Sequence, residues 1–356
     1  MKKRIDLLRD KMIQENIPAL LITNAYNLRY MTGFTGTSGS AIITMDKAYF
    51  ITDFRYVNQA NLQCVGYEII KHEGDMFLTA SELVHHDHIS LIAFDDHHLT
   101  FAQYCHLEEV MGEVELRPLN GMIESLREVK DKDEIATIQE ACRIADSAFA
   151  HILEYIKPGM TEIEVANELD FYMRRQGASG LSFDTIVASG VRSSLPHGVA
   201  SDKVIEKGDF ITLDFGCYYN GYVSDMTRTI SLGNPRYDVL KEIYQIVLDA
   251  HLAVEKAAKP GMTGKALDAV ARDYITEQGY GEYFGHSTGH GIGLEVHESP
   301  MISKMNEVPL VVGNTITDEP GIYLPEIGGV RIENDLLITE NGCESFTTSP
   351  RELIII

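Results

Sequence analysis

The hydrophobic pattern of residues 1–125 alternates between helical and extended segments. Apolar residues recur with a helical period over residues 5–16. Shorter apolar runs predict buried strands, and two of these runs are so close together that they predict a hairpin. The runs span residues 18–23, 40–44, 48–52, 67–70 and 89–94. This alternation favours an α/β domain.

A different pattern begins after residues 126–130, where we place a domain boundary. Residues 131–155 are highly charged, carry apolar side chains at helical spacing and therefore predict a long helix. Pro158-Gly159 follows and is a typical helix stop. We therefore expect two domains, residues 1–125 and residues 126–356.

The second domain contains an internal repeat. The segment Lys157-Pro-Gly-Met-Thr161 recurs as Lys259-Pro-Gly-Met-Thr263, each time between two helix-type patterns. Further along, Gly208-Asp-Phe-Ile-Thr-Leu-Asp214 resembles Gly313-Asn-Thr-Ile-Thr-Asp-Glu319. The repeat predicts an α+β domain built from two duplicated halves, and such halves commonly form a site between them.

Composition narrows the class of protein. The 356 residues include 53 acidic and 30 basic side chains, a formal net charge of −23, so no nucleic-acid partner is expected. A hydrophobic share of 44% is typical of a globular chain rather than a disordered one. Because we find neither a membrane-length apolar stretch nor a signal-peptide core, no membrane association or secretion is expected. The five cysteines form no C-x-x-C pair, which favours the reducing cytoplasm.

Two acidic residues lie on what the pattern predicts to be one hairpin. Asp214 and Asp225 flank a turn at Tyr218-Tyr-Asn-Gly221, and their odd separation puts both side chains on the same face of a two-stranded ladder. Two ionised carboxylates at that distance repel each other unless a cation lies between them. Considered alone, the pair could equally be two solvent-facing aspartates.

The repeat adds a second acidic pair, which favours a metal site over two solvent-facing aspartates. Glu319 occupies the place of Asp214 in the second half, and Glu333 lies on the following strand candidate, as Asp225 does. If both pairs converge on one centre, two divalent cations would neutralise the four carboxylates. Carboxylate donors suit Mn²⁺, with Co²⁺, Fe²⁺ and Zn²⁺ also able to bind.

A glycine-rich segment over residues 284–300 carries three histidines. His286, His290 and His297 are candidates because neutral imidazole binds transition metals and glycine permits close backbone approach. His197 precedes Asp214 by one loop and is a further candidate for the same cleft.

Other patterns that could indicate a metal site or a nucleophile do not change this picture. The histidine-rich patches at 85–88 and 95–98 are interpreted as polar loops. No H-E-x-x-H occurs, which excludes the zinc peptidase mechanism that depends on this motif. Ser287 lies in a G-x-S-x-G match, but the glycines that follow argue against the helix that a serine nucleophile needs.

The acidic pairs and His290 together resemble a known ligand set. Asp214 and Asp225, His290 in Gly-His-Gly-Ile-Gly, Glu319 in Glu-Pro-Gly-Ile-Tyr and Glu333 in Gly-Val-Arg-Ile-Glu are similar to the five ligands of the pita-bread metallopeptidases. That family includes methionine aminopeptidases, proline-specific aminopeptidases and prolidases. The match covers about residues 126–356, and residues 1–125 resemble the creatinase-type domain of the proline-specific branch. The resemblance implies a duplicated α+β pita-bread (creatinase/aminopeptidase) fold with a smaller N-terminal α/β domain.

The resemblance also implies roles for individual residues. The five ligands would hold two metal ions, with Glu333 bridging both. Glu319 would shuttle a proton, while His297 and His286 would stabilise the oxyanion. The positions that match substrate-contact residues of the proline-specific branch are His197, His286, His297, Arg331 and Tyr323.

The implied activity is metal-dependent hydrolysis of Xaa-Pro bonds in dipeptides or short peptides, by a hydroxide held between the two metals, with Mn²⁺ favoured. Chain length favours an Xaa-Pro dipeptidase, and the alternative is an Xaa-Pro aminopeptidase acting on longer peptides. A methionine aminopeptidase-like enzyme and a non-catalytic peptide-binding protein are further alternatives. The resemblance also implies a homodimer.

Two positions depart from the family pattern. Asp318 stands before Glu319, where relatives usually carry an apolar residue, so it could either point away or perturb the site. Met301 stands where dipeptide-specific relatives often carry a basic residue for the proline carboxylate, and Arg331 could serve instead.

Overall fold

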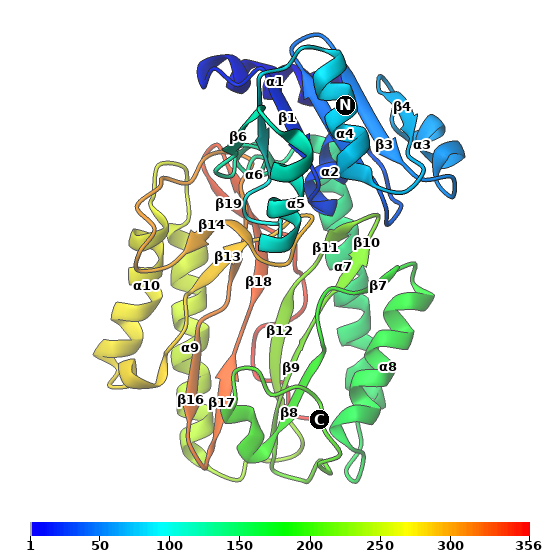
Figure 1. Cartoon of the computed structure of the whole chain (residues 1–356). Helices are drawn as coiled ribbons and strands as arrows, with labels where there is room; N and C mark the ends of the chain where they lie inside the picture. The colour runs from blue at the N-terminus through cyan, green and yellow to red at the C-terminus, as the bar shows by residue number, and fades with distance from the viewer. Residues whose placement is uncertain (1) are drawn as a thin grey trace. The chain divides into compact units, whose positions relative to one another are not determined.

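The structure is a computed structural model that describes residues 2–356. It divides into two compact units, one ending at Arg127 and the other spanning Glu128–Ile356 (Figure 1). Among the described residues, no helix is both long enough and apolar enough to cross a membrane.

The first unit is an α/β domain around a six-stranded sheet, counted over the described residues, with order β4-β3-β2-β1-β5-β6. Strands β1 and β5, β5 and β6, and β3 and β4 are parallel, whereas β1–β2 and β2–β3 are antiparallel. The strands are β1 Ala19–Ile22, β2 Ser40–Thr44, β3 Ala48–Thr52, β4 Glu68–Lys71, β5 Leu91–Phe94 and β6 Glu115–Pro118. The helices are α1 Lys2–Gln14, α2 Ala25–Thr32, α3 Val57–Gln63, α4 Met76–His86, α5 Phe101–Met111 and α6 Glu124–Arg127. The predicted hairpin is the β2–β3 pair.

The interpretation of the histidine-rich patches as polar loops is wrong for His85 and His86, and Asp95 lies in a loop but is buried. His85 and His86 form the last turn of α4, because the apolar face of that helix continues up to Val84. Asp95 is buried, and its carboxylate accepts the backbone N–H groups of Thr23 and Asn24 at 2.6 and 2.9 Å. Asp95 therefore fastens the start of α2 rather than facing solvent.

The second unit consists of two halves that each begin with two long helices and continue with a series of strands, in agreement with the predicted duplicated fold. The first half runs α7 Lys132–Tyr155, α8 Glu162–Arg175, β7 Gly180–Leu181, β8 Ile186–Ser189, the 3₁₀ helix η1 Gly190–Ser194, β9 Phe210–Phe215, β10 Cys217–Tyr219, β11 Tyr222–Val223 and β12 Met226–Ser231. The second half runs α9 Asp238–Ala257, α10 Gly264–Glu277, the 3₁₀ helix η2 Gly281–Tyr283, β13 Gly289–Gly291, β14 Glu298–Ile302, β15 Thr315–Asp318, β16 Gly321–Leu324, β17 Gly328–Arg331, β18 Asn334–Thr339 and β19 Gly342–Ser345.

The repeated Pro-Gly-Met-Thr segments end in equivalent helix caps. The Thr161 side chain accepts the backbone N–H of Glu164 at the start of α8, and Thr263 accepts that of Ala266 at the start of α10. A threonine at this position satisfies one of the N–H groups that a helix leaves unpaired at its start. The repeated letters therefore encode the start of the second helix in each half.

Helices flank the strands of this unit from both sides. In Figure 1 the α7–α8 pair lies on one side of the strands and the α9–α10 pair on the other. Each pair has its own hydrophobic core against the strands of its half, one including Phe149, Leu169 and Leu213, the other Val247, Leu267 and Ile316. The strands between these two cores carry Asp214 and His290, and the other acidic residues lie directly next to strand ends.

The two halves are joined by hydrogen bonds in the middle of the unit. The Glu333 N–H donates to the Thr227 carbonyl at 3.1 Å, and the Thr229 hydroxyl donates to the Arg331 carbonyl at 3.0 Å. These bonds bring the acidic end of the first half against the acidic end of the second.

Candidate metal centre

Asp214 and Asp225 lie on one face of an interrupted hairpin. Strand β9 pairs with β12 in the register that sets Asp214 opposite Thr227, so Asp225 is diagonal to Asp214, as the spacing predicts. At the interruption the two backbones approach so closely that a Cβ atom on Gly216 would lie 1.8 Å from the Ser224 carbonyl oxygen, so only glycine fits there. Beyond this point β10 and β11 form the tip.

The glycines around His290 let its strand fit between two neighbours. Strand β13 pairs with β14 on one side and β15 on the other. A Cβ atom on Gly289 would lie 2.1 Å from the Thr317 carbonyl oxygen, and one on Gly291 would lie 2.3 Å from the Ser299 carbonyl oxygen. Only glycine fits at either position, and the close packing aims His290 at the centre of the unit.

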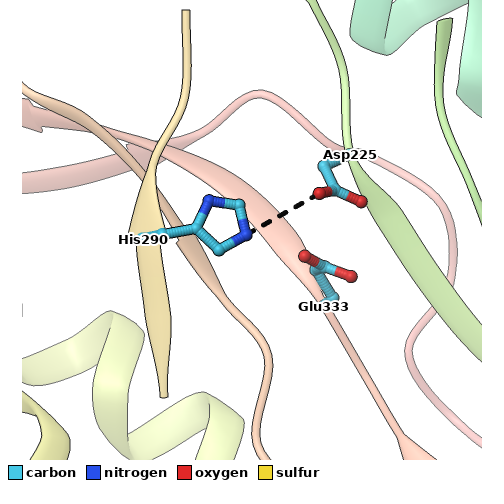
Figure 2. Close-up of side chains that lie close together, drawn as sticks. All are labelled: Asp225, His290 and Glu333. Carbon is cyan, nitrogen blue, oxygen red and sulfur yellow. Dashed lines mark ion pairs between the residues drawn. The ribbon is translucent and has the colours of Figure 1, made fainter. Parts of the chain in front are cut away.

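Figure 2 shows Asp225, His290 and Glu333 pointing toward one another from three different strands or strand ends. Their nearest donor atoms all lie within 4.8 Å of one another. His290 Nε2 is 3.9 Å from Asp225 Oδ2 and 3.2 Å from Glu319 Oε1. Glu319 directly follows β15, so four of the five residues singled out from the sequence meet around one imidazole.

Asp214, the fifth candidate ligand, is bound by the positively charged Arg331. Its Oδ2 accepts a hydrogen bond from Arg331 Nη2 at 2.6 Å. Its Oδ1 is buried and has no hydrogen-bond partner within residues 2–356. A buried carboxylate oxygen without a partner is costly, so the lone pair is available for a cation.

The carboxylates of the metal-free centre cannot all be ionised at once. Burial raises the pKa of Glu333 well above its usual range, and the charges of Glu319 and Asp214 raise it further. Burial and Glu333 raise the pKa of Asp225 in the same way. For Glu319, burial acts upward, but the hydrogen bond and charge of His290 outweigh it and hold its pKa at about 2.

This donor set fits divalent cations. Four carboxylates and one imidazole are concentrated in a buried volume where protons now compensate the negative charge. Carboxylate oxygen with a single imidazole nitrogen is a ligand mixture that suits Mn²⁺ and its borderline neighbours rather than thiophilic metals. The orphaned Asp214 Oδ1 is the clearest single sign that a cation belongs here.

The centre forms the floor of a cavity of about 410 Å³, within the size range of small-molecule sites. All five acidic and histidine candidates line it, together with His197, His286, His297 and Arg331. Its apolar walls are made by Phe183, Ile186, Pro196, Val199, Val296 and Met301.

His286 lies at the end of a chain of hydrogen bonds. Arg331 Nη1 donates to the Tyr323 hydroxyl at 2.8 Å, and that hydroxyl lies 2.8 Å from His286 Nε2. His286 Nδ1 lies 2.8 Å from the Ser287 carbonyl, so Nδ1 carries the proton and Tyr323 donates to Nε2. Burial lowers the pKa of His286, which keeps the ring neutral.

His297 and His197 are more exposed. The ring centroid of His297 lies 4.1 Å from that of His290, and burial lowers the pKa of His297. His197 lies in the loop after η1 and lines the same cavity. Both side chains therefore reach the space above the acidic floor.

Asp318 faces away from the centre. Its Oδ2 lies 3.0 Å from His251 Nδ1 of α9, and both side chains are fully buried. Successive side chains alternate along β15, so Thr317 and Glu319 face the centre while Asp318 faces the helix. Of the two possibilities left open by the sequence, the structure therefore favours the one in which Asp318 points away.

Two polar residues next to the centre have no counterpart in the sequence interpretation. The Thr227 hydroxyl donates to Glu333 Oε2 at 2.5 Å and accepts from Arg331 Nε at 3.0 Å. The buried Asp335 accepts the Asp225 N–H at 2.9 Å and the Cys142 thiol at 3.1 Å. Thr227 could have been found from the hairpin register, since it is opposite Asp214, whereas the Asp335 contact depends on tertiary packing.

Comparison with known protein families matches almost the whole chain. The model of metallopeptidase family M24 matches residues 136–340. The model of the creatinase/prolidase N-terminal domain matches residues 4–129.

Individual relatives are similar over nearly their full length. An Xaa-Pro dipeptidase from Bacillus anthracis has a solved structure with a TM-score of 0.97 and 53% identity, covering 100% of this chain and 99% of that one. An X-Pro aminopeptidase from Thermotoga maritima has a TM-score of 0.89 and 43% identity, covering 96% and 98%. An Xaa-Pro dipeptidase from Pyrococcus furiosus is 42% identical, covering 99% of this chain and 100% of the relative.

Proposed function

The chain belongs to metallopeptidase family M24, and we propose that it is a metal-dependent exopeptidase that hydrolyses the Xaa-Pro bond of dipeptides. The duplicated pita-bread fold with an N-terminal creatinase-type domain agrees with this family. The observation that carries the proposal is the buried cluster of four carboxylates and His290 on the floor of a dipeptide-sized cavity. Xaa-Pro dipeptidases recur among the relatives in both comparisons.

The residues that would hold two divalent metal ions are Asp214, Asp225, His290, Glu319 and Glu333. Their convergence and the excess of buried negative charge support this assignment. We favour Mn²⁺, because carboxylate oxygens predominate among the donors. When bound, the metal ions lower the pKa of a water molecule and polarise the scissile carbonyl group.

Glu319 is the candidate for proton transfer to the departing nitrogen. It is only partly buried and lines the cavity, so its carboxylate is accessible to a bound substrate. His297 is the candidate for hydrogen bonding to the oxyanion, since none of its contacts described above engages a ring nitrogen.

His286 is better suited to positioning the substrate than to donating a proton. Both of its ring nitrogens are already hydrogen-bonded, to Ser287 and to Tyr323. We assign His286, Tyr323 and Arg331 to one rigid wall of the cavity, with His197 on another. The chemistry of the site therefore centres on Glu319 and His297.

The shape and polarity of the cavity support selection for proline. The nitrogen of an Xaa-Pro bond carries no hydrogen, so a site that needs an N–H donor there binds it poorly. Apolar side chains such as Ile186, Val199 and Met301 can pack against a pyrrolidine ring instead. Arg331 is the one arginine or lysine in the described lining. Its Nη1 and Nη2 each carry one more N–H than the bonds to Tyr323 and Asp214 use, which makes it the candidate for holding a free proline carboxylate.

A competition digest tests this function. Protein stripped by a chelator and reloaded with Mn²⁺ is given equal amounts of Ala-Pro, Ala-Pro-Gly and Met-Ala-Ser, and the loss of each peptide is followed by mass spectrometry. We expect metal-dependent loss of Ala-Pro first. Faster loss of Ala-Pro-Gly would make the protein an aminopeptidase, and faster loss of Met-Ala-Ser would remove the proline specificity. No cleavage with any divalent metal would leave a peptide-binding protein.

Three further properties belong to this proposal. We assign residues 1–125 to the creatinase-type domain and 126–356 to the catalytic domain, an assignment that the division after Arg127 supports. We also propose a cytoplasmic homodimer. Light scattering during gel filtration tests the dimer, and cell fractionation tests the location.

A further inference from the structure

Each half of the catalytic unit contains a buried carboxylate paired with an arginine, next to the segment that carries a cavity-lining histidine. In the first half the pair is Glu162, the first residue of α8, with Arg192; we name it the Glu162 clamp. In the second half it is Asp268 of α10 with Arg272, the Asp268 clamp. The two acids are 0% and 1% exposed, and all four side chains lie outside the cavity lining.

The Asp268 clamp fixes the backbone on both sides of His286. Arg272 Nε and Nη2 donate to the two Asp268 oxygens at 2.7 and 2.8 Å. The same guanidinium donates to the carbonyl of His286 at 2.7 Å and to that of Phe284 at 3.0 Å. Asp268 Oδ1 accepts the N–H and hydroxyl of Thr288 at 3.0 and 2.9 Å. Four of these six hydrogen bonds hold the segment 284–288 and thus determine where the His286 ring enters the cavity.

The Glu162 clamp closes the base of the loop that carries His197. Glu162 Oε1 accepts the N–H and hydroxyl of Ser189 at 2.8 and 2.9 Å. Glu162 Oε2 accepts the N–H and hydroxyl of Ser201 at 3.2 and 2.7 Å. One buried carboxylate therefore ties together the two ends of the segment 189–201.

Arg192 connects that base to the arm of the loop beside the cavity. Its Nη1 pairs with Glu162 Oε2, and its Nη2 donates to the Val199 carbonyl at 2.9 Å. His197 is two residues from Val199, and both line the cavity. The guanidinium thus fixes the part of the loop that faces the substrate.

We propose that the two clamps are positioning devices for substrate binding: the Glu162 clamp sets His197, and the Asp268 clamp sets His286. This inference rests on the proposed function, because it gives the two histidines a substrate to contact. A buried ion pair adds little net stability over apolar packing, so its benefit here is the fixed conformation of the segment it holds. Precise placement of contact groups is what a small-substrate site requires.

The guanidinium group of each clamp can be changed by a conservative substitution. An arginine can bind a carboxylate and main-chain carbonyls at once, whereas a lysine keeps the charge but cannot span both. Arg272→Lys and Arg192→Lys should therefore loosen one clamp each. Arg143→Lys is the matched control, since Arg143 binds Glu140 of the same helix at 2.9 and 2.7 Å on the exposed surface.

Histidine ring signals test the inference without any need for activity. The Cε1–H resonances of His286 and His197 are assigned with the His286→Ala and His197→Ala variants of the full-length protein. We expect R272K to shift the His286 signal alone and R192K to shift the His197 signal alone, with R143K shifting neither. An unmoved signal in either clamp variant, or a shift of both signals in both variants, overturns the inference.

Kinetics connect the clamps to the substrate. For Ala-Pro hydrolysis, R272K and R192K should each raise KM about tenfold with a smaller change in kcat. R272K should not raise KM further in the H286A variant, and R192K should not raise it further in the H197A variant. When the clamp variant of one half is combined with the histidine variant of the other half, the two increases in KM should multiply. If the increases in KM also multiply in the double variants R272K/H286A or R192K/H197A, the clamp acts only on general stability and the inference is rejected.

The two measurements separate this inference from the proposed function. If the ring signals respond as expected but wild-type protein does not cleave Ala-Pro, the proposed function fails and the positioning of the histidines stands. If wild type cleaves Ala-Pro but the signals do not respond, the clamps are rejected. Should a lysine variant not fold, Thr288→Val and Ser201→Ala each remove one hydrogen bond from the same acids and are expected to give smaller shifts in the same pattern.

Discussion

Strands β8 and β13 hold corresponding places in the two halves of the catalytic unit but carry different side chains. Each pairs with a strand that leads to an acidic residue, β8 with β9 and β13 with β15. Strand β8 is Ile-Val-Ala-Ser, and its Ile186 lies opposite Asp214 and lines the cavity. Strand β13 is Gly-His-Gly, and its His290 points at the acidic cluster.

The difference shows how a duplicated scaffold becomes an asymmetric site. Both halves supply an acidic pair, so the repeat itself provides the charge. Only the second half supplies an imidazole, and this requires glycine on both sides of it. The first half uses the same place for an apolar wall. A change in β13 should therefore remove a metal ligand, whereas a change in β8 should affect only the packing against the substrate.

The largest effect is expected at Glu333. Glu333→Gln should lose metal binding and lower activity by more than about 100-fold, beyond what loss of a residue behind the ligands usually costs. The fold should persist, because the metal-free protein gains by losing one of several repelling carboxylates. Metal content by atomic absorption and activity on Ala-Pro are the measurements. Glu344→Gln on the exposed strand β19 is the control, and an active, metal-loaded E333Q enzyme would falsify the assigned centre.

His297→Ala should affect turnover far more than metal content. Loss of one donor to a developing oxyanion usually lowers kcat by about 100- to 1000-fold. Because the His297 ring lies beside that of His290 without sharing its acidic contacts, metal affinity should stay within a few-fold of wild type. His86→Ala, at an exposed position of α4, is the control. A variant that loses metal but turns over normally once metal is in excess would show that this role for His297 is wrong.

The acidic centre also predicts how the stability of the metal-free protein depends on pH. Burial raises the pKa values of Asp225 and Glu333, so the folded state holds protons that the unfolded state releases above about pH 4. Stability should therefore fall as pH rises from 5 to 7, by about 1.4 kcal/mol per pH unit for each group that keeps its proton. Urea unfolding of chelator-treated protein at the two pH values measures this.

Two controls isolate the cause of that pH dependence. Saturating Mn²⁺ should reduce the pH dependence, because metal replaces the protons of the ligands, whereas the buried Asp318 and Asp335 keep theirs. E333Q should reduce the pH dependence by the contribution of one carboxyl group. Equal stability of the metal-free wild type at pH 5 and pH 7 would contradict the expectation.

Much of this arrangement could be predicted from the sequence, for physical reasons that differ between elements. The α8 and α10 starts were predictable because Pro-Gly-Met-Thr encodes a local cap. The hairpin placement of Asp214 and Asp225 was predictable because side-chain parity follows from spacing alone. The common chemistry of the four carboxylates followed from the repeat, which relates positions that are far apart in the chain.

Other features depend on contacts that no local pattern encodes. Asp95 belongs to a motif that a polar pattern assigns to a loop, yet its burial is decided by packing against the start of α2. The clamps join α8 and α10 to loops more than ten residues away in the sequence, and neither acid stands in a motif. The direction of Asp318 follows from strand alternation only once β15 and its facing helix α9 are known.

A smaller effect is expected for the apolar wall that β8 provides. Ile186→Val removes one methylene from the cavity and should raise KM for Ala-Pro about fourfold, corresponding to about 0.8 kcal/mol. Metal affinity should not change, which is the sharpest contrast with β13. Val187→Ala is the control, because that side chain lies in the core on the opposite face and should lower stability while leaving KM unchanged. A loss of metal in I186V would mean that the two strands are not functionally distinct.

The smallest effect is expected at Asp318, and its neighbour provides the comparison. Burial lowers the pKa of His251 to about 3, so the imidazole facing Asp318 is neutral and Asp318→Val leaves no charge without a partner. Stability should change by no more than about 1 kcal/mol, and activity by less than about twofold. Thr317 faces the other way and donates to Glu319 at 3.2 Å, so Thr317→Val should weaken metal binding about tenfold or more. Isothermal titration of Mn²⁺ into both variants measures the contrast. Equal losses of Mn²⁺ affinity in the two variants would mean that the direction in which a β15 side chain points does not determine its effect on metal binding. Asp318 would then have to act on the metal centre through Glu319.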